Sequence, residues 1–419
     1  MAMAEVHRTD RKMHKRFDDF VAKETCLTQQ KDGKTFYRPK SHDYCEEFGR
    51  ITGDLDRIHS AAVEIPRSLL VSLVSQYDSF IRELFRHLLS ANRDILRGSH
   101  RSLEVGDLLR FGSIEEAFDW AVEREVDEVM RQSHSAQFDF IDTMLAGKWM
   151  REKDPLWRSF IELTERRNLF VHTDGLVSNQ YLEVCQANGV ELDKAVHKGT
   201  ELKVSTAYFK AAREALLEMG IKVCQVLWRK HLPAESADAD DSISDVTYDL
   251  LRAGRYSLAK RLLEFAISTL KNKVHAPETV LMLRVNLAIA MKSLDDKKGF
   301  AQCMAAEDWS RHPETFQLAE AVLQERYHRA VELMKAVGDQ IHKANYRSWP
   351  LFKDIRSLPE FQAIFKELFG EDIHQHDHPL PSLQKPGSPE AEAASRSGEP
   401  TKTRADSPDE HGSGPQILN

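Results

Sequence analysis

Apolar positions recur along most of the chain with the spacing of an α-helix. The clearest run follows Pro66 and consists of Leu69, Leu70, Leu73, Val74, Tyr77, Phe80, Ile81, Leu84, Phe85 and Leu88. Proline is favoured in the first turn of a helix, so we expect this helix to open at Pro66. Helical patterning also starts near Tyr44, after a capping sequence at Ser113, after Pro155 and after Ser205. The sequence therefore predicts an all-α fold.

The helix expected after Pro155 carries an interrupted apolar stripe. Its i, i+4, i+7, i+11 and i+14 positions are Leu156, Phe160, Leu163, Arg167 and Phe170. A guanidinium is always charged, and burying it without a partner is costly. Arg167 therefore needs a carboxylate, a second subunit or a bound anion beside it. Within this chain, Asp78 and Glu83 of the helix after Pro66 are the candidate carboxylates.

The same segment has a purely structural interpretation. Gly175 can be the residue just past a helix C-terminus, and arginine and histidine in the last turn complement the helix dipole. Asn168 and His172 are i, i+4 neighbours and share a second face. The segment thus gathers a fixed cation, an amide and a group that titrates near neutral pH. The helical pattern alone leaves both interpretations open.

A second set of helical patterns repeats farther along the chain. Gly254-Arg255-Tyr256 and Arg326-Tyr327-His328 each lead from one apolar helix into another, with alanine three residues after the tyrosine. The two tyrosines lie about twice the ~34-residue period of tetratricopeptide repeats apart. A middle unit would lie around residues 286–301. Residues 244–370 thus resemble three degenerate tetratricopeptide-like repeats, closed by a cap that contains Trp349 and Phe361.

Composition places further bounds on the chain. Of its 419 residues, 41% are hydrophobic and 30% are charged, which is ordinary for a soluble protein. We expect no membrane span, no signal peptide and a cytoplasmic location. The five cysteines form no CxxC pair, so neither a disulfide framework nor a zinc site is indicated. A net charge of −8 argues against broad electrostatic capture of nucleic acid.

Four segments are predicted not to be helical. Residues 1–35 are interpreted as a basic N-terminal arm and loop, and residues 36–39 as loop-like because of Pro39. Residues 233–243 are small, polar and acidic, which favours a linker between a helical domain (36–232) and the repeats (244–370). Residues 371–419 are rich in proline, serine and charge and are predicted to be disordered. His374, His376 and His378 alternate there and are assigned to a solvated tail.

Most catalytic motifs are absent from the sequence. It has no glycine-rich phosphate loop, no HExxH, no GxSxG and no protein-kinase motif set. His134, His172 and His197 lack the spacing of metal ligands. We therefore expect neither a metal nor a cofactor at the functional site.

The segment Arg167-Asn168-Leu169-Phe170-Val171-His172 resembles the signature of the HEPN family, in which an arginine and a polar residue precede a histidine by a short spacer. The resemblance covers roughly residues 40–232 and implies an all-α bundle. It also implies a metal-independent endoribonuclease that works as a homodimer. The two copies of the motif would meet at a two-fold interface and form one cleft for RNA.

Transferred to this sequence, the resemblance gives each residue a role. His172 would be the general acid or base, and Arg167 would bind the scissile phosphate and stabilise the transition state. Asn168 would orient His172 or the phosphate, and Arg166 would be a second phosphate-binding side chain. Some relatives carry a modified tyrosine shortly after the histidine. Thr173, Asp174 and Gly175 stand there instead, which argues against that mode.

Two functional hypotheses follow from these features. The first is a ribonuclease that acts as a toxin or an anti-phage effector and is regulated by a protein partner bound to the repeats. The alternative is a non-catalytic scaffold that dimerises through the HEPN-like helices and binds partners through the repeats. Substitution of Arg167 and His172 separates the two hypotheses.

Overall fold

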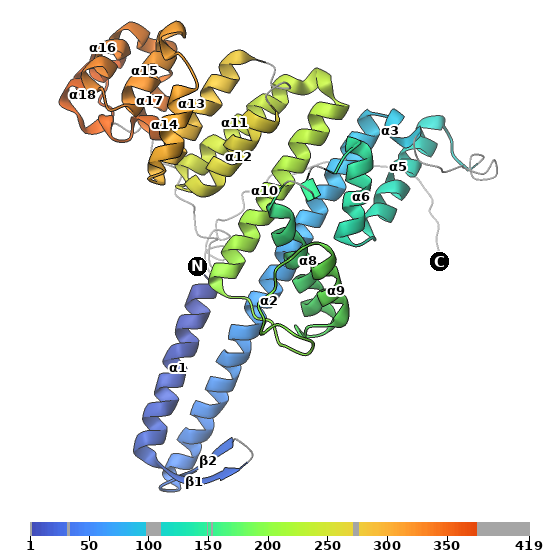
Figure 1. Cartoon of the computed structure of the whole chain (residues 1–419). Coiled ribbons are helices and arrows are strands. Elements are labelled where there is room, and N and C mark those ends of the chain that lie inside the picture. Colours follow the sequence, from blue (N-terminus) through green and yellow to red (C-terminus); the bar gives the residue numbers. More distant parts are fainter. Residues whose placement is uncertain are drawn as a thin grey trace, which may run out of the picture.

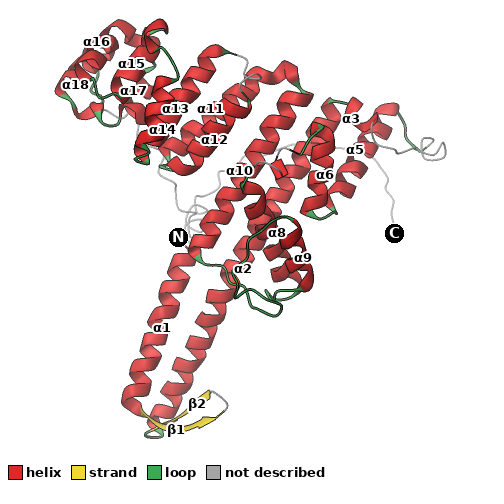
Figure 2. Cartoon of the chain, in the orientation of Figure 1, coloured by secondary structure: helices red, strands yellow, loops and turns green. Residues whose placement is uncertain are grey.

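The computed structural model describes residues 2–31, 34–97, 110–148, 150–151, 154–270 and 276–374. These residues form helices almost throughout, with one small β-hairpin (Figure 2). The all-α prediction is confirmed. No helix in the described ranges is long and apolar enough to cross a lipid bilayer.

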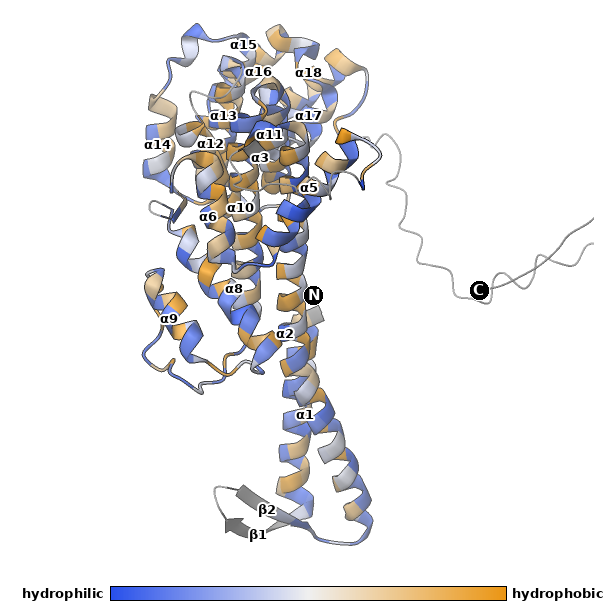
Figure 3. Cartoon of the chain, turned by 90° about the vertical axis from the view of Figure 1, so that its right-hand side faces the viewer, coloured by the Kyte–Doolittle hydropathy of each residue, from blue (hydrophilic) through white to orange (hydrophobic). Residues whose placement is uncertain are grey.

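The N-terminal helix forms a stalk with the helix that follows it. α1 (Ala2–Glu24) packs along the first half of α2 (Asp43–Ala91), and the pair extends away from the other helices (Figures 1 and 3). Phe20 of α1 is buried and lies 6.0 Å from the ring of Phe48 in α2. The prediction of a basic arm and loop at 1–35 is therefore wrong, because apolar residues among the charges give α1 a buried face.

A β-hairpin joins the two stalk helices. β1 (Thr25–Lys31) pairs antiparallel with β2 (Lys34–Pro39), with a register irregularity between Leu27 and Gln29. Residues 36–39 were expected to be loop-like, and they lie in β2 instead. Pro39 stands at the end of the strand, where its missing N–H removes little from the ladder.

The helix expected to open at Pro66 begins much earlier, at Asp43. Pro66 lies buried inside α2, and the chain is helical on both sides of it. Proline removes one backbone hydrogen bond and normally ends or kinks a helix. Packing outweighs this cost, since Ile51 and Ala62 before the proline and Leu70 after it are all buried.

The second half of α2 lies at the centre of a helical body. α3 (Asp94–Arg97), α5 (Ile114–Met130), α6 (His134–Leu145), α8 (Leu156–His172), α9 (Asn179–Ala187) and α10 (Thr206–His231) complete the body. Phe85, Phe138 and Phe160 are fully buried between these helices. The cap predicted at Ser113 is confirmed, since its hydroxyl accepts a hydrogen bond from the Glu116 amide.

α10 continues into the next helices without a flexible connection. A short 3-10 turn (Pro233–Glu235) leads directly into α11 (Ser236–Arg252), which packs on α10. The predicted linker at 233–243 is therefore wrong. Ala239 and Ile243 lie one helical turn apart and are buried, and buried Asp240 is neutralised by Arg229 at 2.5 Å. The acidic composition concealed this amphipathic pattern.

The C-terminal region consists of consecutive helical hairpins (Figure 1). They are formed by α11 with α12 (Tyr256–Thr269), α13 (Pro277–Ser293) with α14 (Lys297–Ala305), and α15 (Glu314–Leu323) with α16 (Tyr327–Val337). Each joint holds one residue in the left-handed region: Gly254 (φ 68°), Asp295 (φ 56°) and Glu325 (φ 58°). In each joint the next amide donates to the carbonyl five residues earlier. The three units thus share one turn geometry, although only the first has glycine there.

The last hairpin is covered by an aromatic cluster. Its residues come from α17 (Lys343–Ser348), the 3-10 turn Pro350–Phe352 and α18 (Pro359–Phe369). Further 3-10 turns lie at Trp309–Arg311, Gly338–Gln340 and Ile355–Ser357. The Trp349 indole donates to Asn286 Oδ1 at 3.0 Å, and Phe352 and Phe361 are fully buried. The predicted tail is packed at its start, where Ile373 is buried. Residues 375–419 lie outside the described residues.

Candidate active site

The segment singled out by the sequence forms the end of α8. The Thr173 and Gly175 amides both donate to the carbonyl of Leu169, which closes the helix. Gly175 has a φ of 80°, and a Cβ there would lie 3.0 Å from the Phe170 ring and 3.3 Å from Arg67 Nη2. The prediction that Gly175 lies just past the helix C-terminus is confirmed, and both its conformation and its close neighbours require glycine.

Arg167 projects from α8 toward α2. Its Nη2 donates to Asp78 Oδ2 at 3.0 Å, and its Nη1 donates to Asn168 Oδ1 at 3.0 Å. The other Asp78 oxygen lies 2.8 Å from Nε2 of His134, which is buried at the start of α6. Asp78 was one of the two carboxylates expected to face Arg167, and this prediction is confirmed. Glu83 pairs with Arg86 instead.

Glu165 adds a second carboxylate to this cluster. It is buried on α8 and accepts a hydrogen bond from Asn168 Nδ2 at 3.4 Å. Burial raises the pKa of the Glu165 carboxyl from its ordinary value, while nearby His134 and the bond from Asn168 lower it by less. We define the Arg167 network as Asp78, His134, Glu165, Arg167 and Asn168. It holds the arginine in one orientation.

A second arginine fixes the turn after His172. Arg67 of α2 is buried and donates to Asp174 Oδ1 at 2.9 Å and to Glu201 Oε1 at 2.7 Å. It also lies against the ring of Phe170 at 5.5 Å. These contacts tie α2, the end of α8 and the segment before α10 together. Arg67 therefore positions the chain on which His172 stands.

His172 itself is exposed at the last position of α8. Among the described residues it has no hydrogen bond or ion pair, so none joins it to the Arg167 network. An i, i+5 pair on a helix points to different sides, which explains why the two side chains separate. Val171 and Leu176 beside it are large apolar residues, exposed by 49% and 46%.

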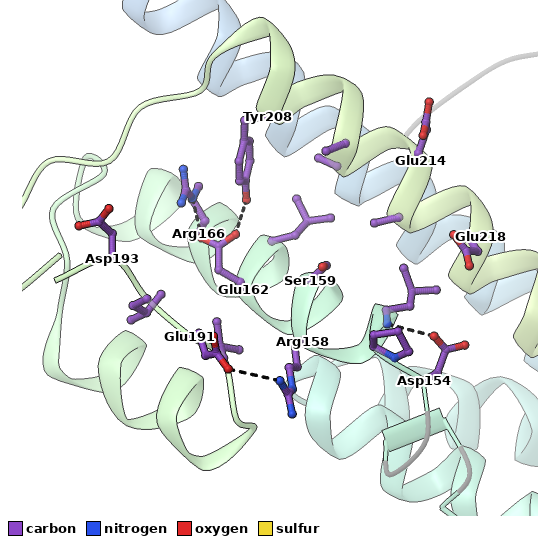
Figure 4. Close-up of a pocket in the computed structure, with 18 of the residues that line it drawn as sticks. Asp154, Arg158, Ser159, Glu162, Arg166, Glu191, Asp193, Tyr208, Glu214 and Glu218 are labelled. Atoms are coloured by element: carbon purple, nitrogen blue, oxygen red, sulfur yellow. Dashed lines mark hydrogen bonds and ion pairs between the residues drawn. The ribbon is translucent and has the colours of Figure 1, made fainter. Parts of the chain in front are cut away.

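Arg166 lies in a different environment from the other predicted site residues. Its Nε donates to Glu162 at 2.7 Å, its Nη1 donates to the carbonyl of Lys203, and its guanidinium stacks on Tyr208 (Figure 4). Glu162 also accepts hydrogen bonds from the hydroxyls of Tyr181 and Tyr208. Burial and the Glu162 carboxylate raise the pKa of Tyr208 well above its ordinary value. The structure does not bring Arg166 together with Arg167.

A cavity of about 820 Å³ lies beside Arg166 between α8, α10 and the loop after α9. Arg166, Glu162 and Tyr208 line it, whereas Arg167 and His172 do not (Figure 4). Glu162 accepts hydrogen bonds from three side chains of the same chain, and Arg166 donates through Nε and Nη1 to groups of the same chain. The predicted substrate-binding role of Arg166 stays a prediction, because this arginine lines a cavity that Arg167 and His172 do not reach, and its contacts with Glu162 and Tyr208 hold α8 against α10.

Sequence reasoning missed two residues that the structure places at the site. His134 reaches the Arg167 network from another helix, and nothing in its local sequence marks it. Arg67 had a detectable signal, because it continues the stripe of Leu70, Val74 and Tyr77 at helical spacing. The rule applied to Arg167 would have shown that Arg67 also needs carboxylates.

Comparison with protein-family models, with curated proteins and with solved structures gives no match. The site is therefore interpreted from its own residues and geometry.

Proposed function

We propose that this protein is a metal-independent endoribonuclease of the HEPN type, acting as a toxin or anti-phage effector. The observation that carries the proposal is the end of α8. There Arg167 and Asn168 are held in place by the Arg167 network, and an exposed histidine follows within the next turn. A fixed cation and an accessible imidazole, brought to one substrate by two copies of the chain, would provide the two functions that metal-free RNA cleavage needs.

In the proposed reaction, the ribose 2′-hydroxyl attacks the adjacent phosphorus while His172 takes up or delivers a proton. The 5′-oxygen leaves with a proton, and a 2′,3′-cyclic phosphate remains on the upstream fragment. Arg167 would stabilise the negative charge that develops on the phosphoryl oxygens. Two of its five N–H groups are used by Asp78 and Asn168. Its side chain is 22% exposed, so further N–H groups can face a phosphate.

A symmetric dimer would complete this site. His172 and Arg167 of one chain point to different sides of α8, so the two copies would have to share one substrate. Val171 and Leu176, both exposed near His172, offer apolar surface for a contact between copies at this face. Val171→Glu is expected to give a folded monomer with reduced cleavage, measured by analytical ultracentrifugation and an RNA assay. A variant that stays dimeric would place the interface elsewhere.

The helical hairpins supply the regulatory part of the proposal. Their repeated joint geometry is typical of arrays that bind proteins along one face. α10 packs both in the helical body and against α11 and α12. A partner bound to the hairpins would therefore contact a region that α10 joins directly to the helical body.

A non-catalytic scaffold is the second candidate, and one observation favours it. Arg167 already has a carboxylate partner in Asp78 at 3.0 Å, as a purely structural arginine would. In this case α8 would serve dimerisation, and the hairpins would bind the partner.

The test is cleavage of total RNA and tRNA by the purified chain in excess chelator. His172→Ala is the informative variant, because it removes no hydrogen bond or ion pair from the described structure. We expect it to lower the cleavage rate by about 100-fold or more, the usual contribution of a general acid or base. The products of the wild-type chain should carry 2′,3′-cyclic phosphate ends.

His197→Ala is the matched control, since His197 is exposed on the loop before α10. It should cleave like the wild-type chain. Equal cleavage by His172→Ala would remove the histidine from the chemistry. A stable wild-type dimer that cleaves neither substrate would favour the scaffold.

A further inference from the structure

A cluster of two imidazoles and one carboxylate lies between the stalk helices. Asp10 and His14 are i, i+4 neighbours on α1, and His59 faces them from α2. One ligand-type atom from each residue lies within 4.8 Å of the others. The cluster is separate from the Arg167 network and has no part in the proposed cleavage.

The distances within the cluster match those between metal ligands. Asp10 Oδ1 lies 3.3 Å from His14 Nδ1 and 3.6 Å from His59 Nδ1. With metal–ligand bonds of about 2.0–2.1 Å, two ligands of a tetrahedral zinc ion stand about 3.3–3.4 Å apart. The three side chains therefore need little rearrangement to bind one ion.

The carboxylate oxygen at the centre of the cluster lacks a donor. Asp10 Oδ1 is buried and has no hydrogen-bond partner, because its contacts with the two imidazoles lack hydrogen-bond geometry. A buried carboxylate oxygen without a donor or cation is unfavourable. A cation bound by the three side chains would satisfy it.

The surroundings leave one side of the cluster accessible. The side chains of His14 and His59 are 48% and 58% exposed. A small cavity of about 170 Å³ adjoins the cluster and is lined by His7, Asp10, His59, Ala62, Val63, Arg67, Lys203 and Val204. The cationic side chains of this cavity, Arg67 and Lys203, donate no hydrogen bond to Asp10 Oδ1. Arg67 is paired with the carboxylates of Asp174 and Glu201. His14 Nδ1 also lies 3.0 Å from the Asp10 carbonyl, so a bound metal has to displace that contact.

We propose that Asp10, His14 and His59 form a site for a divalent transition-metal ion, with zinc as the best fit. Two imidazoles and a carboxylate are ligands that Zn²⁺, Co²⁺ and Ni²⁺ accept, whereas Mg²⁺ and Ca²⁺ prefer oxygen ligands throughout. Water would fill the fourth position on the exposed side. The ion would bind α1 to α2 near the base of the stalk.

The proposal is tested by titrating the full-length chain, stripped of metal and free of an affinity tag, with Co²⁺ and Zn²⁺. We expect one Co²⁺ per chain with the visible absorption of a four- or five-coordinate ion. We also expect a Zn²⁺-dependent rise in melting temperature. His59→Ala and His14→Ala should weaken Zn²⁺ binding by more than about 100-fold, since loss of an outer partner alone costs roughly 10–100-fold.

Two controls separate this cluster from other histidines. His87→Ala removes an exposed histidine from the same helix α2 and should bind metal like the wild-type chain. Joint replacement of His374, His376 and His378 by alanine should also leave binding unchanged. Unchanged binding in His14→Ala and His59→Ala would overturn the proposal, as would loss of binding in the tail variant. A wild-type chain that binds neither ion at micromolar concentration would overturn it as well.

Discussion

Two of the arginine–carboxylate pairs that join helices in this protein differ in burial. At the junction of α10 and α11, Arg229 and Asp240 have side chains exposed by 0% and 4%. Between α8 and α2, Arg167 and Asp78 are exposed by 22% and 23%. The first pair is enclosed and cannot reach a ligand, so its role is to fix two helices. The second pair keeps a surface, so its arginine can hold the helices and also face a phosphate.

The largest effect is expected from breaking the enclosed pair. Asp240→Ala leaves the Arg229 guanidinium buried without its carboxylate, which typically costs about 3–5 kcal/mol of unfolding free energy. Urea unfolding followed by circular dichroism measures the loss. Asp241→Ala removes the exposed neighbour and should change stability by less than about 0.5 kcal/mol. Equal stability of the two variants would show that the buried Arg229–Asp240 pair does not stabilise the junction of α10 and α11.

Arg67 tests an intermediate case, a buried arginine with exposed partners. Its carboxylates Asp174 and Glu201 have side chains exposed by 86% and 48%, so both rehydrate when the arginine is removed. We expect Arg67→Ala to cost about 2 kcal/mol, the scale of a hydrogen bond to a charged group. Hydrogen exchange should rise in residues 173–177. Arg57→Ala is the control, because Arg57 is an exposed α2 arginine whose Asp54 partner is on the same helix.

Arg167→Ala is expected to lower the cleavage rate strongly and the free energy of unfolding only slightly. Its removal leaves Asp78 bonded to His134 and partly hydrated, so we expect a loss of only about 1 kcal/mol. Cleavage should fall by about 100- to 1,000-fold if the arginine stabilises the transition state. Arg167→Lys keeps the charge but not the fork of N–H groups, and should recover little activity. A large stability loss with intact cleavage would show that Arg167, like Arg229, only holds two helices together.

The smallest effect is expected at Glu165. Its pKa is raised in the folded state, so its contribution to stability is present below the ordinary glutamate pKa and is lost as the pH rises through the folded value. Glu165→Gln should therefore match the wild-type chain near pH 4 and be slightly more stable at pH 7 and above. Melting temperatures measured across this range test the sign. A variant less stable at pH 7 would show that the ionised form is favoured by the Arg167 network.

The sequence predicts those contacts of the site that a pattern along a single helix can indicate. The interrupted stripe of α8 predicted that Arg167 needs a carboxylate and gave Asp78 as a candidate, because both residues lie on long amphipathic helices. Arg67 was missed because Pro66 was interpreted as a helix start, which placed Arg67 in a terminal turn. His134 was missed because its contact with Asp78 depends on how α6 packs against α2.

The linker prediction failed for a related reason. Residues 233–243 are acidic, and composition alone favours an exposed linker. The deciding pattern is the turn-spaced pair Ala239 and Ile243, which is short and becomes significant only where α10 and α12 offer a surface to cover. Burial of Asp240 was also invisible in the sequence, since its partner Arg229 lies on the preceding helix and no local pattern pairs the two.

The sequence by itself determined the helical character of the chain, the end of α8 shortly before Gly175, the helical hairpins and the need of Arg167 for a carboxylate. These features follow from helical periodicity, capping and the cost of burying charge, which act over one or two turns. Only the tertiary structure decided that His172 stands apart from Arg167, that Arg67 holds the turn, and that His59 meets Asp10 and His14. Such contacts join helices distant in sequence, and their geometry is set by packing between helices rather than by any local pattern.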